Sequence, residues 1–122
     1  MSNRFNNPAV AFALVGIGGA IGVGLRYACM LLFSGIALWL INIVGSFCLA
    51  FLHEVVMNKR AEQLVRLVVM TGILGSFTTF SSFSYEWFTL MQQSMLRGVL
   101  YALCMTASCI GAAYIGSVVG KR

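Results

Sequence analysis

Long apolar runs alternate with short polar connections along the whole 122-residue chain. Four of these runs are long enough to cross the hydrocarbon core of a membrane, which takes about 20 mostly apolar residues in a helix. They cover roughly residues 9–33, 35–57, 64–90 and 98–120. We therefore predict an all-α membrane protein of four transmembrane helices, with residues 1–122 forming a single domain.

Composition supports a membrane protein and excludes several other classes. Hydrophobic residues make up 60% of the chain, and charged residues make up 9%. The formal net charge of +5 comes mostly from basic residues at the edges of apolar runs. These residues do not form the basic patch with interspersed aromatic residues that is typical of nucleic-acid binding. We expect a lipid bilayer around the chain and no nucleic-acid partner. Because the sequence shows no nucleophile paired with a base, we expect no enzyme activity.

Local signals mark one helix start and two packing faces. Asn7 followed by Pro8 is typical of the start of a helix. Small residues at four-residue spacing let helix backbones approach closely, and we interpret them as ordinary packing faces. They are Gly18 and Gly22 in the first span, and Ser108, Ala112, Gly116 and Gly120 in the fourth.

The third span carries polar side chains that a lipid-facing helix does not favour. From Thr71 to Glu86 it contains seven serine and threonine residues, together with the acidic residue Glu86. Two glycines followed by Ser76, Thr78 and Thr79 weaken the helix near the middle of the span, and residues of this kind tolerate an unwound turn whose carbonyls can face an ion. An unbroken helix, whose hydroxyls bond back to the preceding turn, fits the composition as well.

Aromatic and amide side chains add a second candidate feature. Phe77, Phe80 and Phe83 recur every three residues, so on a continuous helix they form one stripe. Such stripes usually serve packing. Ring edges carry the positive part of the aromatic quadrupole, however, so Phe edges beside serine hydroxyls can also surround a small anion. Asn42, in the middle of the second span, is either an interhelical hydrogen-bond partner or a donor to a permeating ion.

Four short helices offer little interior in which to shelter polar groups from lipid. Arg26, Asn42 and Glu86 nevertheless lie at or near membrane depth, so we expect the chain to form an oligomer. Arg26 lies near the end of the first span. It either extends to the membrane interface or lines a vestibule that attracts anions.

Three motifs resemble, in order, those of the Fluc (CrcB-like) fluoride channels, and the likeness covers most of the chain. Residues 18–22 with Arg26 are similar to the first-span signature, and residues 41–47 to the family's Val-Asn-x-x-Gly-Ser-Phe segment. Residues 72–86 are similar to the helix-break and phenylalanine-box sequence, which is the most specific of the three. One departure is the stretch 35–39, where the family often carries Pro-Gly-Thr.

The resemblance implies a dimer of two four-helix subunits inserted antiparallel, with two fluoride pores and a central structural sodium ion (Na+). The partner is a second copy of the chain or an oppositely oriented paralogue. Sodium is expected at the backbone carbonyls of Gly75 and Thr78, where the third helix is broken. The resemblance assigns the fluoride pore to Asn42, Phe80, Phe83, Ser81, Ser82, Arg26 and Glu86, with the last two toward the pore ends.

The family's role implies passive export of cytoplasmic fluoride across the cell inner membrane. Basic residues favour one orientation, because cytoplasmic loops of membrane proteins carry an excess of Lys and Arg. We therefore predict a preference for both termini in the cytoplasm. The residues on that side are Arg4, Lys59, Arg60, Arg66, Lys121 and Arg122, against Arg97 and Arg26 on the other.

An alternative function is that of a small multidrug-type proton-coupled transporter, which also has four spans. Such a transporter needs a membrane-buried carboxylate that exchanges protons for cationic substrates. The first span of this chain contains no acid, and Glu86 lies late in the third span. The sequence therefore favours the fluoride channel.

Overall fold

The computed structural model describes residues 7–56 and 62–122, which contain helices and no strand. Four helical stretches are long and apolar enough to cross a membrane, so the four predicted spans are confirmed. The elements are α1 (Pro8–Leu32), α2 (Ala37–Val56), α3 (Glu62–Val65), the π-helical segment η1 (Arg66–Leu74), α4 (Gly75–Phe77), α5 (Phe80–Gln93) and α6 (Met95–Gly120).

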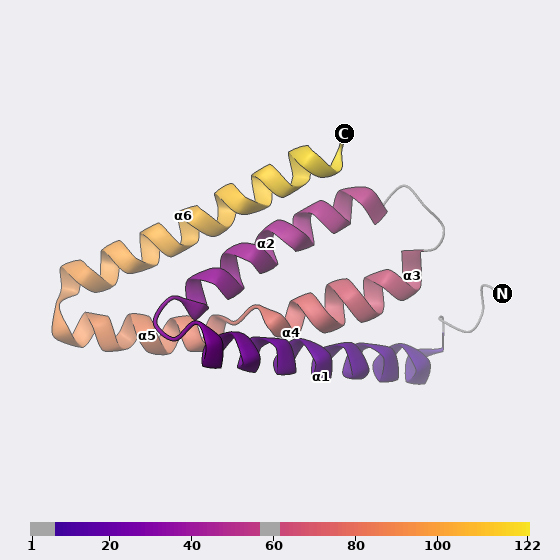
Figure 1. The fold of residues 1–122 in the computed structure, drawn as a ribbon, viewed down its shortest axis with the longest axis horizontal. Coiled ribbons are helices and arrows are strands. Elements are labelled where there is room, and N and C mark those ends of the chain that lie inside the picture. The colour runs from indigo at the N-terminus through magenta and orange to yellow at the C-terminus, as the bar shows by residue number, and fades with distance from the viewer. Residues whose placement is uncertain (1–6, 57–61) are drawn as a thin grey trace.

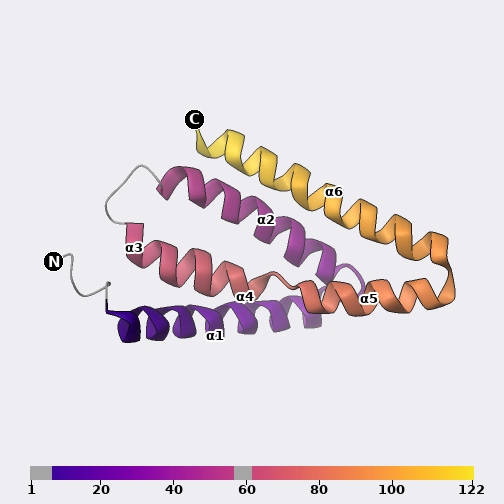
Figure 2. The ribbon, with the colours of Figure 1, turned by 180° about the vertical axis from the view of Figure 1, so that it is seen from behind.

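The helices form two closely packed pairs. α1 packs along η1 and α4, and α2 packs along α6 (Figure 1). α5 continues past the end of α1 and packs mainly against α6, as the view from behind also shows (Figure 2). The start of α1 and the ends of α2 and α6 lie at one end of the molecule, and the turn between α5 and α6 lies at the other.

Capping and glycine contacts explain where α1 begins and how the pairs approach. The Asn7 side chain accepts a hydrogen bond from the Ala9 N–H at 3.0 Å, which confirms the predicted helix start. Gly18 and Gly22 lie directly against the backbone of η1, where a Cβ would overlap carbonyl oxygens. Gly116 and Gly120 stand in the same relation to the backbone of α2, so these four predicted packing positions are confirmed.

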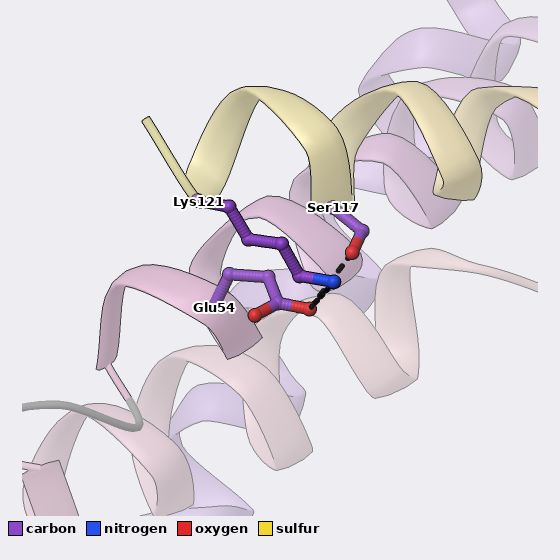
Figure 3. Close-up of polar contacts among 3 residues, drawn as sticks. All are labelled: Glu54, Ser117 and Lys121. Atoms are coloured by element: carbon purple, nitrogen blue, oxygen red, sulfur yellow. Dashed lines mark hydrogen bonds and ion pairs between the residues drawn. The ribbon is translucent and has the colours of Figure 1, made fainter.

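A polar cluster joins the ends of α2 and α6 (Figure 3). The Ser117 hydroxyl donates a hydrogen bond to Glu54 Oε1 at 2.7 Å, and Lys121 Nζ lies 3.7 Å from the same oxygen. The Lys121 side chain is 65% exposed, and an ion pair of this kind contributes little to stability. The hydrogen bond from Ser117 is therefore the firmer part of the cluster.

The third span changes its backbone conformation between α4 and α5. Thr78 (φ −69°, ψ 151°) and Thr79 (φ −144°, ψ 120°) are both extended. The break was expected at Gly75 to Thr78; only Thr78 of that stretch is extended, because Gly75–Phe77 are helical, and the extended segment continues to Thr79 instead. Threonine is β-branched and tolerates extended backbone, and the Thr79 hydroxyl caps α5 by accepting a hydrogen bond from the Ser82 N–H.

Few apolar side chains are buried within the chain. Among the described residues the buried apolar side chains are Ala37, Ile41 and Met105, whereas many large apolar residues on every long helix are exposed. A water-soluble protein does not expose so much apolar surface, but lipid or a partner in the membrane can cover it. The exposed surface therefore agrees with a membrane location.

We expect Gly116→Ala to lower the free energy of unfolding by about 1–3 kcal/mol, because the added Cβ would overlap the Phe47 carbonyl where α6 packs on α2. Unfolding in detergent micelles, followed by circular dichroism, measures the change. Gly111→Ala on the same helix is the control, since a Cβ there meets no atom within 4 Å. An equal loss of stability in both variants would contradict this packing.

Candidate functional site

Two hydrogen bonds between α2 and the start of α5 form the centre of the candidate site. The buried Asn42 accepts a hydrogen bond from the Thr79 N–H at 2.9 Å and donates one from Nδ2 to the Thr79 carbonyl at 3.3 Å. The Asn42 side chain thus forms hydrogen bonds with both the N–H and the carbonyl of Thr79, which is extended. Asn42 therefore forms an interhelical hydrogen bond, and its second amide N–H makes no hydrogen bond to any described residue.

Three hydroxyl groups gather at the same point. Thr79 Oγ1 lies 3.2 Å from Ser81 Oγ and 3.2 Å from Ser82 Oγ. The same oxygen accepts the hydrogen bond from the Ser82 N–H at 3.3 Å. Thr79 is itself buried, with 6% of its surface exposed. The start of α5 therefore carries a compact cluster of hydroxyls at membrane depth.

Two backbone carbonyls beside this cluster lose their helical donors. In a continuous helix the Gly75 carbonyl would accept from the Thr79 N–H, and the Thr78 carbonyl would accept from the Ser82 N–H. Instead, Thr79 donates to Asn42 and Ser82 donates to the Thr79 hydroxyl. Carbonyls freed in this way are the groups that coordinate Na+ in interrupted membrane helices. The residues present therefore fit a sodium ion.

Side chains offer no competing metal site in the described part of the chain. No group of three or more His, Cys, Asp or Glu residues lies close enough there to hold a metal ion. The described cysteines, at 29, 48, 104 and 109, are free thiols. The oxygen atoms near the interruption are those of backbone carbonyls, of the Asn42 amide and of the Thr79, Ser81 and Ser82 hydroxyls.

A groove of about 370 Å³ opens beside Asn42 between α2, α5 and α6, and we call it the phenylalanine groove. The ring centroids of Phe80 and Phe83 lie 5.7 Å apart with a tilt of 36°. The wall thus combines an amide, hydroxyls and two phenyl rings with no charged side chain. The lining residues are Asn42, Ser46, Thr78, Thr79, Phe80, Phe83, Met105, Thr106, Cys109 and Ile110.

A chain of aromatic rings borders the groove. Phe83 stacks on Tyr101 with centroids 5.6 Å apart and ring planes 18° apart. Trp39 meets Tyr101 in a T-shaped arrangement, at 5.7 Å and 86°. The Tyr101 hydroxyl donates a hydrogen bond to Glu86 Oε2 at 2.9 Å. These contacts connect α5 to α6 and, through α6, to α2.

Two further grooves are lined by residues of α2 and by other parts of the bundle. The Glu86 groove, of about 450 Å³, is lined by Met30, Ser34, Gly35, Ala37, Leu38, Ser82, Tyr85, Glu86 and Thr89. The Glu54 groove, of about 580 Å³, is lined by Ser46, Leu49, Ala50, His53, Glu54, Met70, Ala113 and Ser117. Ser46 on α2 lines both the Glu54 groove and the phenylalanine groove.

The structure brings some of the predicted site residues together and leaves others apart. Asn42, Phe80 and Phe83 share the phenylalanine groove, with Thr78 beside them. Ser82 and Glu86 line the Glu86 groove, and Ser81 contacts the Thr79 hydroxyl. Arg26 and Gly75 line none of the three grooves. Arg26 is partly buried on α1 and forms no ion pair with a described residue.

The predicted stripe of three phenylalanines is wrong. Phe77 belongs to α4, and the extended pair at Thr78 and Thr79 separates it from the rings on α5. It lies instead near Gly45 of α2, where a Cβ on the glycine would come within 3.5 Å of its ring. Only Phe80 and Phe83 form the ring pair of the groove.

Sequence reasoning missed several residues of the site. Ser46 follows Asn42 by one helical turn, so spacing alone was a signal for it. Thr79 was recognised only as one of several hydroxyls, although it holds the centre of the cluster. The contacts of Tyr101 with Phe83 and Glu86 join α6 to α5, and no sequence pattern indicated them.

The residues behind the predicted orientation are described only in part. Arg4, Lys59 and Arg60 lie outside the described residues. Lys121 and Arg122 are exposed after the end of α6, and Arg97 is exposed near its start. The described basic residues of α6 therefore lie at opposite ends of the molecule.

We expect Asn42→Ala to lower the free energy of unfolding by about 1–3 kcal/mol, because it leaves the Thr79 N–H and carbonyl without their partner. Hydrogen exchange at the Thr79 amide should accelerate in the same variant. Ser46→Ala is the matched control one turn away, and it should leave that amide protected. Unchanged exchange at Thr79 in Asn42→Ala would show that another group satisfies this N–H.

Comparison with known proteins adds a family and several relatives. Residues 13–117 match the family described as CrcB-like protein, Camphor Resistance (CrcB). A protein of Thermotoga maritima named "Fluoride-specific ion channel FluC" is 40% identical, over 90% of this chain and 94% of its own length. A protein of Bacillus licheniformis named "Fluoride-specific ion channel FluC 2" is 38% identical, over 92% of this chain and 88% of its own length. A Methanococcus vannielii protein, also named "Fluoride-specific ion channel FluC", is 34% identical, over 90% of this chain and 95% of its own length.

Proposed function

The chain belongs to the CrcB-like family of fluoride-specific ion channels, and on this basis we propose that it is a fluoride-selective channel that passively exports cytoplasmic fluoride. It is a multi-pass membrane protein with four apolar helices. The observation that carries the proposal is the phenylalanine groove, where an amide, hydroxyls and two phenyl rings meet without a charged side chain.

The chemistry of the groove suits a small anion that must also leave again. Fluoride holds its water strongly, so a pore has to replace that water with other donors. The second amide N–H of Asn42 and the hydroxyls of the groove are such donors, and the edges of Phe80 and Phe83 add positive potential. A fixed cation would hold the anion too tightly for conduction. Passage through the groove requires no energy source and follows the fluoride gradient.

A second groove beside the first suggests the route beyond the two phenyl rings. Ser46 joins the phenylalanine groove to the Glu54 groove, which continues along α2 and α6 toward their ends. Ser81 and Ser82 belong to the hydroxyl cluster at the start of α5 and continue the polar lining there. We assign Arg26 and Glu86 to the pore ends, where Arg26 attracts anions through its charge.

The interruption of the third span supports a structural cation. Thr78 and Thr79 interrupt the helix, and the carbonyls of Gly75 and Thr78 lose their usual donors. These two carbonyls from each of two chains would give Na+ four oxygen ligands at a shared axis. Bound there, the cation would neutralise converging carbonyl dipoles and join the two chains at their centre.

An antiparallel dimer is the proposed assembly, with a second copy or an oppositely oriented paralogue as partner. Phe80 is 79% exposed in the single chain, so the proposed pore wall needs a further surface to cover it. We place the assembly in the cell inner membrane and propose that this chain prefers both termini in the cytoplasm. Topology reporters fused to the C-terminus measure that preference.

The multidrug-type transporter is not favoured. Its mechanism needs a membrane carboxylate that exchanges protons with water, and no acid occurs in α1. The Glu86 carboxylate is engaged by the Tyr101 hydroxyl at 2.9 Å. The relatives that cover most of this chain are named as fluoride channels.

Liposomes that contain the purified chain should release fluoride down its gradient, as measured with a fluoride electrode. Phe80→Ile should lower the rate at least tenfold, because it replaces a positive ring edge with an aliphatic surface. Phe12→Ile is the matched control, since Phe12 is 78% exposed on α1, away from the grooves. No release, or equal release of chloride, would rule out the fluoride channel.

Removal of sodium should weaken the assembly. When N-methylglucamine, a cation too large for two pairs of carbonyls, replaces Na+ throughout purification, we expect a lower temperature of dimer dissociation. Size-exclusion chromatography after heating measures the shift, and return of Na+ should restore it. The same dissociation temperature in both salts would contradict a structural sodium site at Gly75 and Thr78.

A further inference from the structure

The chain of aromatic rings that ends at Phe83 begins on a different helix, and we propose that Trp39 is a positioning residue for the Phe83 ring. The inference rests on the proposed function, because it assigns Trp39 a task in the same groove. Trp39 does not line the phenylalanine groove. The described ring contact that leads from it to the groove runs through Tyr101.

Contacts between neighbouring rings restrict the ring plane of Tyr101 and, through it, that of Phe83. Phe83 is stacked on Tyr101 with planes only 18° apart, so the plane of Tyr101 largely sets that of Phe83. Tyr101 is held on one side by Trp39, at 86°, and at its hydroxyl by Glu86. The hydroxyl contact fixes the tip of Tyr101 but leaves rotation about the ring axis free. Trp39 is the group that opposes this rotation.

The orientation of Phe83 matters because a phenyl ring has two electrostatic faces. Its edge is positive and its face is negative, so rotation about the side-chain axis would turn an attractive surface into a repulsive one for an anion. Phe80, which is 79% exposed, tilts 36° against Phe83. The plane of Phe83 therefore also affects how the neighbouring ring can lie.

The packing of α5 explains why such a device is needed. α5 packs mainly against α6, and its principal link to α2 is the Asn42 contact at its first turn. Trp39 precedes Asn42 by three residues and therefore lies on a similar face of α2. α2 thus holds α5 at two points, directly at Thr79 through Asn42 and one turn later at Phe83 through Trp39 and Tyr101.

Fluoride and chloride efflux from liposomes tests the inference with two substitutions of Trp39. Trp39→Leu keeps much of the apolar volume without a ring, and we expect it to lower fluoride efflux about threefold to tenfold and to reduce fluoride selectivity over chloride, as expected from the strength of one aromatic pair. Trp39→Phe retains a ring and should restore most of both properties. Leu40→Ala, at the exposed neighbouring position, is the control that should behave like the unsubstituted chain.

A double-substitution cycle distinguishes positioning from general packing. In a Phe83→Ile background there is no ring to orient, so Trp39→Leu should produce no further change in efflux or selectivity. Additive losses, or full efflux and selectivity in Trp39→Leu alone, would overturn the inference and leave the channel assignment intact. Absence of fluoride efflux from the unsubstituted chain would overturn the proposed function and this inference with it.

Discussion

An extended residue inside a membrane-spanning helix must find partners for its N–H and carbonyl, because lipid offers none. In this protein one amide side chain supplies both partners, from Asn42 of α2 to Thr79. The rest of the candidate site depends on that pairing. It permits α5 to begin anew at Phe80, places the Thr79 hydroxyl beside two serines, and leaves the Gly75 and Thr78 carbonyls without their helical donors.

One interruption of the third span therefore produces two different chemical environments a few residues apart. On one side are carbonyl oxygens, which suit a cation. On the other are N–H and O–H donors with phenyl edges, which suit an anion. Under the proposed function, the first would hold the assembly together, and the second would conduct without trapping its ion. The aromatic contacts of Trp39 and Tyr101 stiffen the second environment from outside the groove.

Sequence patterns predicted the spans well because length and apolarity alone decide which helices can cross a membrane. The start of α1 and the glycine packing positions also followed from local rules, namely the capping residues and the four-residue spacing of small residues. The position of the interruption could not be predicted in this way. It is decided by the tertiary contact with Asn42 and the cap by Thr79, and the glycine content does not decide it. The predicted stripe that included Phe77 was wrong for the same reason, because the interruption separates Phe77 from Phe80 and Phe83. The Tyr101 contacts were beyond prediction, since they depend on how α5 and α6 pack.

The glycines at the two close helix contacts have a consequence for how this sequence can change. At Gly18, Gly22 and Gly116 the obstructing atoms belong to the backbone of the opposing helix. A second substitution can shrink a side chain, but it cannot shrink a backbone carbonyl. A methyl group added at these positions therefore has no compensating partner elsewhere in the same interface. We therefore expect packing alone to restrict change at these positions, so their constancy among relatives would be a poor guide to the pore.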